Sequence, residues 1–250
     1  MTNPSRAYAE RGILENPEVI EMLGNADLIK NEYFKLRVKA LIGIAKKFGK
    51  RRSEIAALER EDLRIENDQL YVTFTLRKKH KRGLFQYIAF LEKNNPSALD
   101  KPHSQLKQEW KLWTETEQGY RVKEDRRTKS VSIQDTYAKL ILQYLAFLNV
   151  KYPAAKYVFP SGVEIFGTSY MIFENEHLSG RQLLRLIKPL SPTAWLHLFR
   201  ETKGAEIAKA NGRTLASVYE VRETLDLENE ETAYRYVRRY AVQEMKAENS

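Results

Sequence analysis

The feature that most constrains the fold is a change in hydrophobic periodicity along the chain. From Phe34 to Phe48 apolar residues recur every three or four positions, which predicts a helix over residues 30–47 that ends at Gly49. Residues 69–76 read Gln-Leu-Tyr-Val-Thr-Phe-Thr-Leu and are rich in β-branched and aromatic side chains, so they predict a strand. Residues 129–133 are its predicted antiparallel partner.

Helical patterns lie on both sides of these strands. Before them, short helices are predicted over 16–24, closed by Gly24, and over 53–60, capped by Ser53. After them, helices are predicted over 134–149, 179–186, 191–210, 215–224 and 231–245. The order of helices, small antiparallel sheet and helices predicts a mainly α (α+β) domain and argues against a parallel sheet.

The segment between the two predicted strands, 77–128, is basic at both ends. It is too long for a plain connection, so we expect it to carry helices of its own. The predicted organisation is a tail over 1–14, one domain over 15–245 with this basic insertion at about 77–128, and a tail over 246–250.

Charge narrows the class of partner. The formal net charge is +9 at pH 7, which favours nucleic acid or an anionic membrane surface. The chain has no cysteine, which excludes disulfides and thiol nucleophiles. With four histidines and no H-E-x-x-H spacing, no metal site is predicted. No signal peptide or membrane-spanning stretch is visible, so we expect a cytoplasmic protein with no membrane partner.

Cleavage of a phosphodiester by a side-chain hydroxyl needs a nucleophile, cations on the non-bridging oxygens and an acid for the leaving oxygen. The stretch Phe48-Gly49-Lys50-Arg51-Arg52-Ser53-Glu54-Ile55-Ala56-Ala57-Leu58 resembles the first-arginine motif of the tyrosine recombinases, or phage integrase family, roughly T-G-x-R-x-S-E-L-x-x-L. The match places the catalytic arginine on Arg51. An ordinary helical turn with surface arginines is the alternative for this motif alone.

Two further motifs follow in the family's order. Residues 196–202 resemble its H-x-x-R-H-T box, which implies His197 and Arg200 as phosphate ligands and puts Glu201 where the second histidine usually stands. His197 and Arg200 are three residues apart and so share a helix face. A lone histidine on an apolar helix is the alternative.

The third motif, residues 225–237, resembles L-G-H-x-x-x-x-T-T-x-x-Y and implies Tyr236 as the nucleophile. Asp226 replaces the glycine and Leu227 replaces the histidine or tryptophan, which removes one hydrogen-bond donor to the phosphate. Tyr234 and Tyr240 are alternatives if the register is shifted.

The family also has a lysine on the hairpin between its second and third strands, which protonates the leaving oxygen. Lys78 lies at about that place, and Lys129 is a weaker candidate. The basic segments at the ends of the insertion are expected to contact DNA phosphates through Lys79, Lys81, Arg82, Arg126, Arg127 and Lys129.

The resemblance covers roughly residues 15–245. It implies a site-specific recombinase that cleaves and rejoins double-stranded DNA through a 3′-phosphotyrosine, with no cofactor, metal or ATP. It further implies a homo-tetramer on DNA, a monomer in free solution and a nucleoid-associated location. The poor fit of the third motif points to the integrases of archaeal viruses and plasmids, and so to an origin in a virus or mobile element.

Three other interpretations stay open at this point. A catalytically inactive relative that only binds DNA would explain Leu227 and Glu201. A topoisomerase would use the same chemistry. An unrelated basic helical nucleic-acid-binding protein would have Arg51, His197, Arg200 and Tyr236 far apart.

Overall fold

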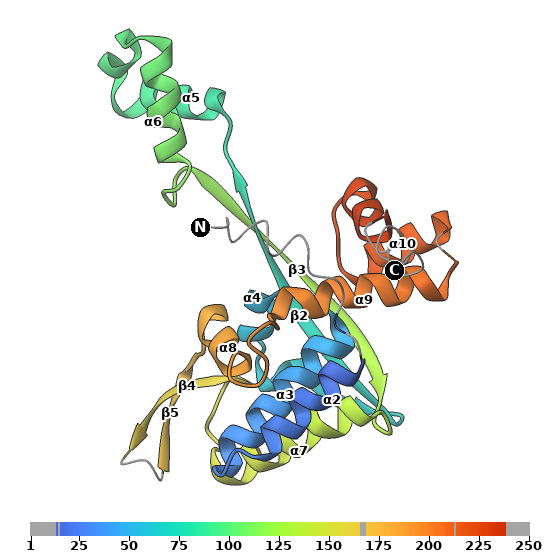
Figure 1. Cartoon of the computed structure of the whole chain (residues 1–250). Coiled ribbons are helices and arrows are strands. Elements are labelled where there is room, and N and C mark those ends of the chain that lie inside the picture. The colour runs from blue at the N-terminus through green and yellow to red at the C-terminus, as the bar shows by residue number, and fades with distance from the viewer. Residues whose placement is uncertain (1–13, 15, 166–168, 213, 239–250) are drawn as a thin grey trace. The chain divides into compact units, whose positions relative to one another are not determined.

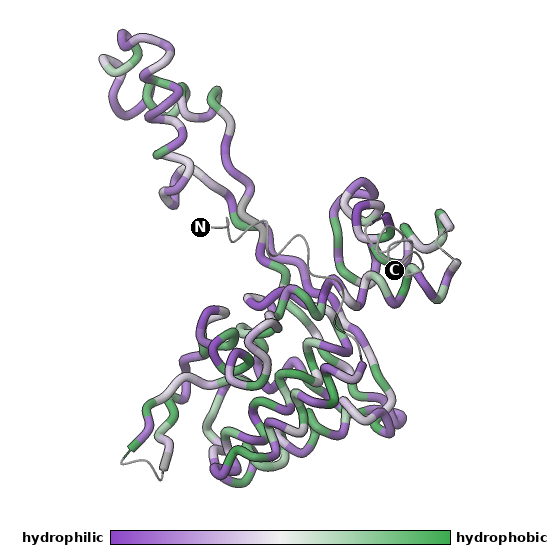
Figure 2. Tube along the Cα trace, in the orientation of Figure 1, coloured by the Kyte–Doolittle hydropathy of each residue, from purple (hydrophilic) through white to green (hydrophobic). Residues whose placement is uncertain are grey.

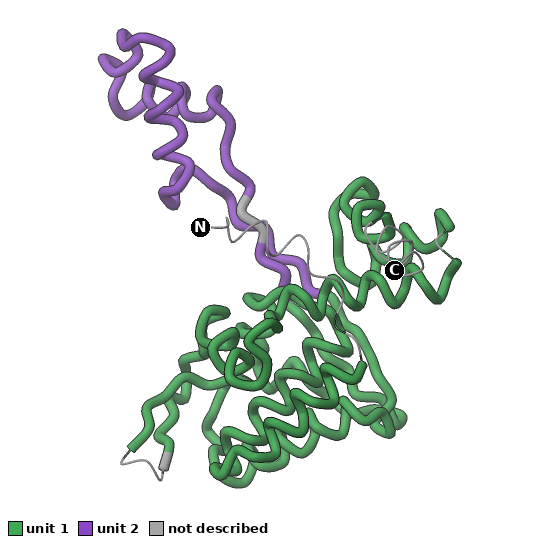
Figure 3. The backbone as a smooth tube through the Cα atoms, viewed as in Figure 1, with its two compact units in different colours: residues 1–74, 127–250 green, residues 75–126 purple. Residues whose placement is uncertain are grey.

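The computed structural model describes residues 14, 16–165, 169–212 and 214–238, without the side chains of Lys78, Lys79 and Ser169. The chain divides into two compact units (Figure 3). Unit 1 is formed by residues 1–74 and 127–250, and unit 2 by residues 75–126.

The first part of unit 1 is helical (Figure 1). Helix α2 spans Asn16–Asp27 and α3 spans Glu32–Phe48. The side chain of Asn31 caps α3 by accepting from the Phe34 amide at 3.3 Å. Helix α2 does not end at Gly24 as predicted but runs three residues further, because this glycine keeps helical geometry.

A short helix and a turn lead into the sheet. Helix α4 covers Arg52–Ala56, and a 3₁₀ turn, η1, covers Arg60–Asp62. The predicted cap at Ser53 is wrong, since this residue lies inside α4 and Arg51 occupies the extended N-cap position. Glu54 accepts from the Arg51 amide at 2.9 Å, which fixes the start of the helix.

The main sheet has three strands in the order β1-β2-β3. Strand β1 (Leu63–Glu66) pairs antiparallel with β2 (Gln69–Lys81), with Leu63 opposite Val72. Asn67 and Asp68 connect them with φ values of 49° and 57°, the left-handed geometry that a two-residue hairpin turn requires. Strand β3 (Tyr120–Ser132) completes the sheet, so the small sheet within a helical domain is confirmed.

The second part of unit 1 returns to helices. They are α7 (Thr136–Lys151), α8 (Gly180–Ile187), α9 (Leu196–Ala210) and α10 (Leu215–Thr224), followed by helical residues 230–238. Between α7 and α8 lies a hairpin that the sequence analysis did not predict, β4 (Pro160–Ile165) with β5 (Ser169–His177).

The predicted start of α9 at Ser191 is wrong. The Ser191 hydroxyl accepts from the Ala194 amide at 3.2 Å within a turn. Trp195 is then extended, with φ −150°, so the helix begins only at Leu196.

Unit 1 contains two clusters of buried side chains. The larger one joins α3, which packs on α7 and α9, to the buried face of the sheet. In Figure 2 hydrophobic stretches are visible along these helices. The smaller cluster contains Val218, Val221, Leu225, Ala233 and Val237, and it holds α10 and residues 230–238 together.

Unit 2 has a separate core. Helix α5 (Leu84–Asn94), the 3₁₀ turn η2 (Pro96–Asp100) and helix α6 (His103–Trp113) bury Tyr87, Leu91, Ala98, Leu106 and Trp113. The rings of Tyr87 and Trp113 lie 5.2 Å apart. Unit 2 covers residues 75–126, and the insertion was predicted at about 77–128.

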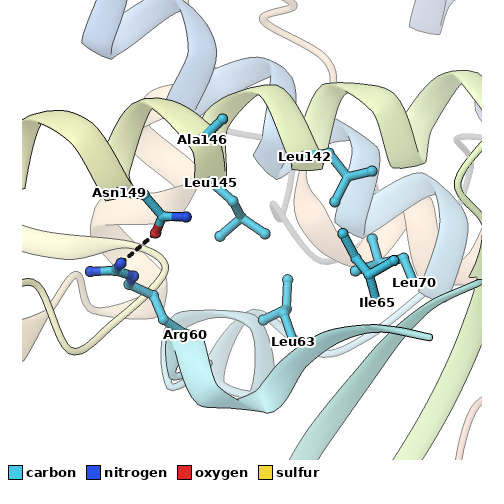
Figure 4. A pocket seen from close by; sticks show the side chains of 8 residues that line it. All are labelled: Arg60, Leu63, Ile65, Leu70, Leu142, Leu145, Ala146 and Asn149. Carbon is cyan, nitrogen blue, oxygen red and sulfur yellow. Dashed lines mark hydrogen bonds between the residues drawn. The ribbon is translucent and has the colours of Figure 1, made fainter. Parts of the chain in front are cut away.

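A pocket of about 440 Å³ lies in unit 1 between β1 and α7 (Figure 4). Leu63, Ile65, Leu70, Leu142 and Leu145 line its apolar part. At one side Arg60 hydrogen-bonds Asn149 and donates to the carbonyl oxygens of Tyr152, Pro153 and Ala155, which ties η1 to the end of α7. Among the described residues that line the pocket, none belongs to the predicted catalytic set.

Candidate active site

The first part of the candidate site is the loop between α3 and α4. Gly49 ends α3 in the left-handed region at φ 58°, with its amide donating to the Ala45 carbonyl at 3.0 Å. The chain therefore turns sharply and Arg51 begins α4. Its Nη1 donates to Glu54 Oε1 at 2.7 Å, and its side chain is 42% exposed. Arg51 thus presents a positioned, partly exposed cation.

Arg200 lies on α9 and is 1% exposed. Its Nη1 donates to the Gly49 carbonyl at 2.9 Å, and its Nη2 donates to the Leu225 carbonyl. One guanidinium therefore ties the Arg51 loop to the end of α10. Burial lowers the pKa of Arg200, and the nearby positive charge of Arg51 lowers it further. Electrostatic attraction to the Tyr236 side chain is the largest effect that raises this pKa and so opposes the shift.

Tyr236 lies in the helical segment 230–238. Asn229 caps this segment by accepting from the Thr232 amide at 2.9 Å. The ring packs on α9 at Gly204, where an added Cβ would stand 2.9 Å from Tyr236 Cδ1. Helix α9 thus lets the ring approach closely beside Arg200.

The two alternative tyrosines differ from Tyr236 in placement. Tyr234 is 54% exposed. Tyr240 lies outside the described residues. Arg51 and Tyr236 are both close electrostatic neighbours of Arg200, so the structure brings these three residues together from three separate segments of unit 1.

His197 stands three residues before Arg200 on α9, and its side chain is 56% exposed. Its Nε2 lies 3.5 Å from Glu201 Oε1, so the residue in place of the family's second histidine contacts the first one.

Leu227 is half-buried and packs, as does Tyr236, against the smaller apolar cluster. Its amide donates to the Arg222 carbonyl at 2.9 Å. A leucine side chain has no hydrogen-bond donor and cannot bind a phosphate. Leu227 instead packs beside the helix that carries Tyr236.

The predicted lysines fall in different places. Lys78 and Lys79 lie in β2 and their side chains are outside those described. Lys129, in unit 1, donates from Nζ to the Glu223 carbonyl at 2.7 Å and lies 3.6 Å from Asp226 Oδ1. It therefore sits beside the turn that precedes the Tyr236 helix.

The other predicted DNA contacts lie on the strands β2 and β3, except Arg82, which directly follows β2. Lys81 in unit 2 pairs with Glu115 and is 58% exposed. Arg82 is exposed, and its carbonyl accepts from the Trp110 ring nitrogen at 2.9 Å. Arg126 and Arg127 are both exposed on β3.

Sequence reasoning missed one pair. Lys50 Nζ forms an ion pair with Asp226 Oδ2, and the two side chains are 0% and 5% exposed. A signal for it existed, because Asp226 stands where the resembling motif has glycine. Asp226 has φ 49°, a conformation that glycine adopts freely and that aspartate tolerates better than most residues.

Comparison with solved structures identifies the fold. The XerH site-specific recombinase bound to its difH substrate, in a pre-cleavage complex, matches 94% of this chain and 52% of its own with a TM-score of 0.55 and 15% identity. Its post-cleavage complex on palindromic difH matches 98% of this chain and 54% of its own, with a TM-score of 0.54 and 14% identity. The XerA recombinase matches 96% of this chain and 65% of its own, with a TM-score of 0.52 and 13% identity.

This chain thus spans about half to two thirds of the length of these proteins. The chain has the fold of a tyrosine recombinase catalytic domain, as the motifs predicted. The sequence matches no family profile and no curated protein. No helix in the described ranges is long and apolar enough to cross a membrane.

Proposed function

We propose that this protein is a site-specific DNA recombinase that cleaves and rejoins double-stranded DNA through a 3′-phosphotyrosine. The observation that carries the proposal is the convergence of Arg51, Arg200 and Tyr236, which are far apart in sequence and carry the three motifs. The fold supports it, and the similar XerH structures are complexes with difH substrate. This arrangement also weighs against an unrelated basic protein.

Each arginine has a definite part in the proposed reaction. Arg200 has five N–H donors, and two carbonyl oxygens accept from two of them. We infer that the remaining donors serve the phosphate, since Tyr236 lies close enough to Arg200 to influence its pKa. Arg51 and Arg200 bind the non-bridging oxygens and stabilise the charge that develops there. This electrostatic work needs no bound cofactor or metal.

The proposed reaction exchanges a phosphodiester bond of the DNA for a bond between Tyr236 and phosphorus. The Tyr236 oxygen attacks phosphorus, its proton passes toward His197, and the bond from phosphorus to the 5′ oxygen breaks. A lysine gives a proton to the departing 5′ oxygen. The phosphotyrosine conserves the energy of the broken bond, so rejoining needs no ATP.

Lys78 is the proposed acid on the resemblance, and Lys129 is the alternative beside the Tyr236 helix. A DNA substrate with sulfur in place of the bridging 5′ oxygen separates them, because a thiolate leaves without a proton. We expect Lys78→Met to cleave the oxygen substrate slowly and the sulfur substrate at the normal rate. Lys129→Met is expected to cleave both substrates slowly. The reverse result assigns the acid to Lys129.

The central experiment traps the covalent intermediate. Nicked duplexes of randomised sequence are incubated with the wild type, with Tyr236→Phe and with the matched control Tyr234→Phe, and resolved on a denaturing gel. A covalent band for the wild type and Tyr234→Phe, and none for Tyr236→Phe, is expected. A band that survives in Tyr236→Phe and vanishes in Tyr234→Phe would show that the register of the third motif is shifted and that Tyr234 is the nucleophile.

A catalytically inactive DNA-binding relative is the second candidate function. The observation in its favour is Leu227, which lies in an apolar cluster where a phosphate donor is expected. Tight, salt-sensitive DNA binding with no covalent band on any duplex would establish it.

Assembly and location follow from the proposed reaction. Exchange between two DNA sites requires four cleavages, so we infer a homo-tetramer on DNA built from monomers in free solution. DNA as the substrate implies a nucleoid-associated protein of the cytoplasm, and the chemistry suits a virus or mobile element. Sedimentation with and without the selected duplex tests the assembly.

A further inference from the structure

The Lys50–Asp226 ion pair joins the two segments that carry Arg51 and Tyr236. Lys50 directly precedes Arg51, and Asp226 lies on the turn between α10 and the Tyr236 helix. The pair bridges 176 positions of sequence. Both side chains are almost fully buried, and the Lys50 ammonium also lies 5.1 Å from the centre of the Phe74 ring.

The end of α10 receives cations at successive carbonyl oxygens. Lys129 donates to Glu223 O at 2.7 Å, Lys50 Nζ lies 3.4 Å from Thr224 O, and Arg200 donates to Leu225 O. The last carbonyls of a helix have no partner within it and carry its negative dipole end, so cations are favoured there. Asp226 balances this positive charge, since its two oxygens face Lys50 and Lys129.

Stability alone does not account for such a pair. Two charges removed from water lose hydration that their attraction only partly returns, and apolar side chains of similar size are often as stable or more so. Burial lowers the pKa of Lys50 despite the carboxylate beside it, which shows that desolvation outweighs the attraction. What the pair adds is a fixed direction and distance between two loops.

We propose that the Lys50–Asp226 pair is a positioning element of the cleavage site. It holds the turn before the Tyr236 helix against the Arg51 loop and so sets the reach of the tyrosine to the arginine-bound phosphate. This inference rests on the proposed function. Neither side chain touches the reacting atoms.

The test removes both charges together. Lys50→Met/Asp226→Asn keeps side-chain size, and asparagine tolerates the positive φ at position 226. The matched control is Lys39→Met/Asp27→Asn, which removes an ion pair between α2 and α3 outside the site. Four quantities are measured: thermal midpoint, affinity for the selected nicked duplex, rate of covalent-complex formation at saturating duplex, and amide exchange of residues 223–227 without DNA.

If the pair positions the tyrosine, the double variant melts near the wild type and binds DNA within about twofold, yet forms the covalent complex at least about tenfold more slowly. Its 223–227 amides also exchange faster. The control changes none of these. A wild-type cleavage rate, or unchanged exchange, overturns the inference.

The two proposals fail differently. If the wild type gives no covalent complex on any duplex, the proposed function fails. The exchange measurement, which needs no DNA, still decides whether the pair holds the turn in place.

Discussion

At Gly204 helix α9 has no side chain, and the ring of Tyr236 packs closely against the space that a methyl group would enter. Gly204→Ala would place a carbon 2.9 Å from Tyr236 Cδ1 and 3.4 Å from its Cβ, so the ring must move. We expect covalent-complex formation to slow about tenfold with unchanged DNA affinity, because a small misplacement of a nucleophile is costly.

The control for this substitution is Gly24→Ala, on a helix where nothing lies within 4 Å of the new carbon. Both substitutions gain about 1 kcal/mol of helix propensity, so a general change in stability would affect both variants. An equal cleavage rate in Gly204→Ala and Gly24→Ala would contradict the placement of Tyr236 against α9.

Lys50 makes stability depend on pH in a definite direction. Burial lowers the pKa of Lys50 below the ordinary 10.5, and the positive charge of Lys129 lowers it further. The negative charges of Asp226 and Glu54 raise this pKa but do not cancel the effect of burial. Between that lowered pKa and 10.5 the unfolded chain binds more protons than the native protein, so the free energy of unfolding rises with pH. We expect the wild type to gain stability relative to Lys50→Met as the pH rises through this window.

Urea unfolding of both proteins at neutral and several alkaline pH values measures the difference, with Lys151→Met as the surface-lysine baseline. Other titrations cancel because they are common to the variants. A difference that stays constant or falls with pH would show that the attraction of Asp226 equals or outweighs the desolvation of Lys50 in the native protein.

At the scale of the elements, Gly49 determines how α3 gives way to the Arg51 loop. Gly49→Ala puts a side chain at φ 58° and a carbon 2.9 Å from Lys203 Cβ and 3.0 Å from Leu225 Cδ2. The left-handed conformation alone costs about 1–2 kcal/mol for a residue with a side chain. The close contact with Leu225, which directly precedes Asp226, adds to this cost.

Gly212→Ala is the matched control, since Gly212 has φ 62° and nothing within 4 Å. We expect Gly49→Ala to lower the free energy of unfolding by more than Gly212→Ala and to slow cleavage, whereas Gly212→Ala loses stability only. Chemical denaturation and the covalent-complex assay test this. Equal losses in both would show that the contacts around Gly49 relax freely.

The sequence predicts these elements best where local chemistry decides them. Residues 215–224 form the expected helix, and Gly49 and Asn211-Gly212 end helices as expected. The hairpin of β4 and β5 was missed because it is a two-stranded ribbon with Val163, Met171 and Phe173 partly exposed, so burial imposes no alternation. The start of α9 was wrong because Ser191 caps a turn instead of a helix.

The candidate site divides in the same way. Motif spacing singles out Arg51, Arg200 and Tyr236, but their proximity depends on tertiary bonds such as that from Arg200 to the Gly49 carbonyl. The Lys50–Asp226 pair joins residues 176 positions apart, and no local pattern relates them. Asp226 by itself indicated only that the turn differs from the motif.

At the scale of the whole molecule, the chain has separate cores in its two units. The buried side chains of unit 2 pack among α5, η2 and α6, and the two clusters of unit 1 contain no residue from 75–126. A core that does not depend on another can fold without it. Unit 2 also carries Lys81 and Arg82, which we expect to contact DNA phosphates.

Replacing residues 80–121 with Asn-Gly, a sequence suited to a two-residue hairpin turn, tests this division. We expect unit 1 to unfold cooperatively at a similar temperature and, because Lys78 and the three converging residues remain, to form the Tyr236 adduct. The slope of log affinity against log salt should fall by about two, one for each of Lys81 and Arg82. An unchanged slope would show that neither Lys81 nor Arg82 contacts DNA phosphates. Loss of cooperative unfolding would show that unit 1 does not fold independently of unit 2.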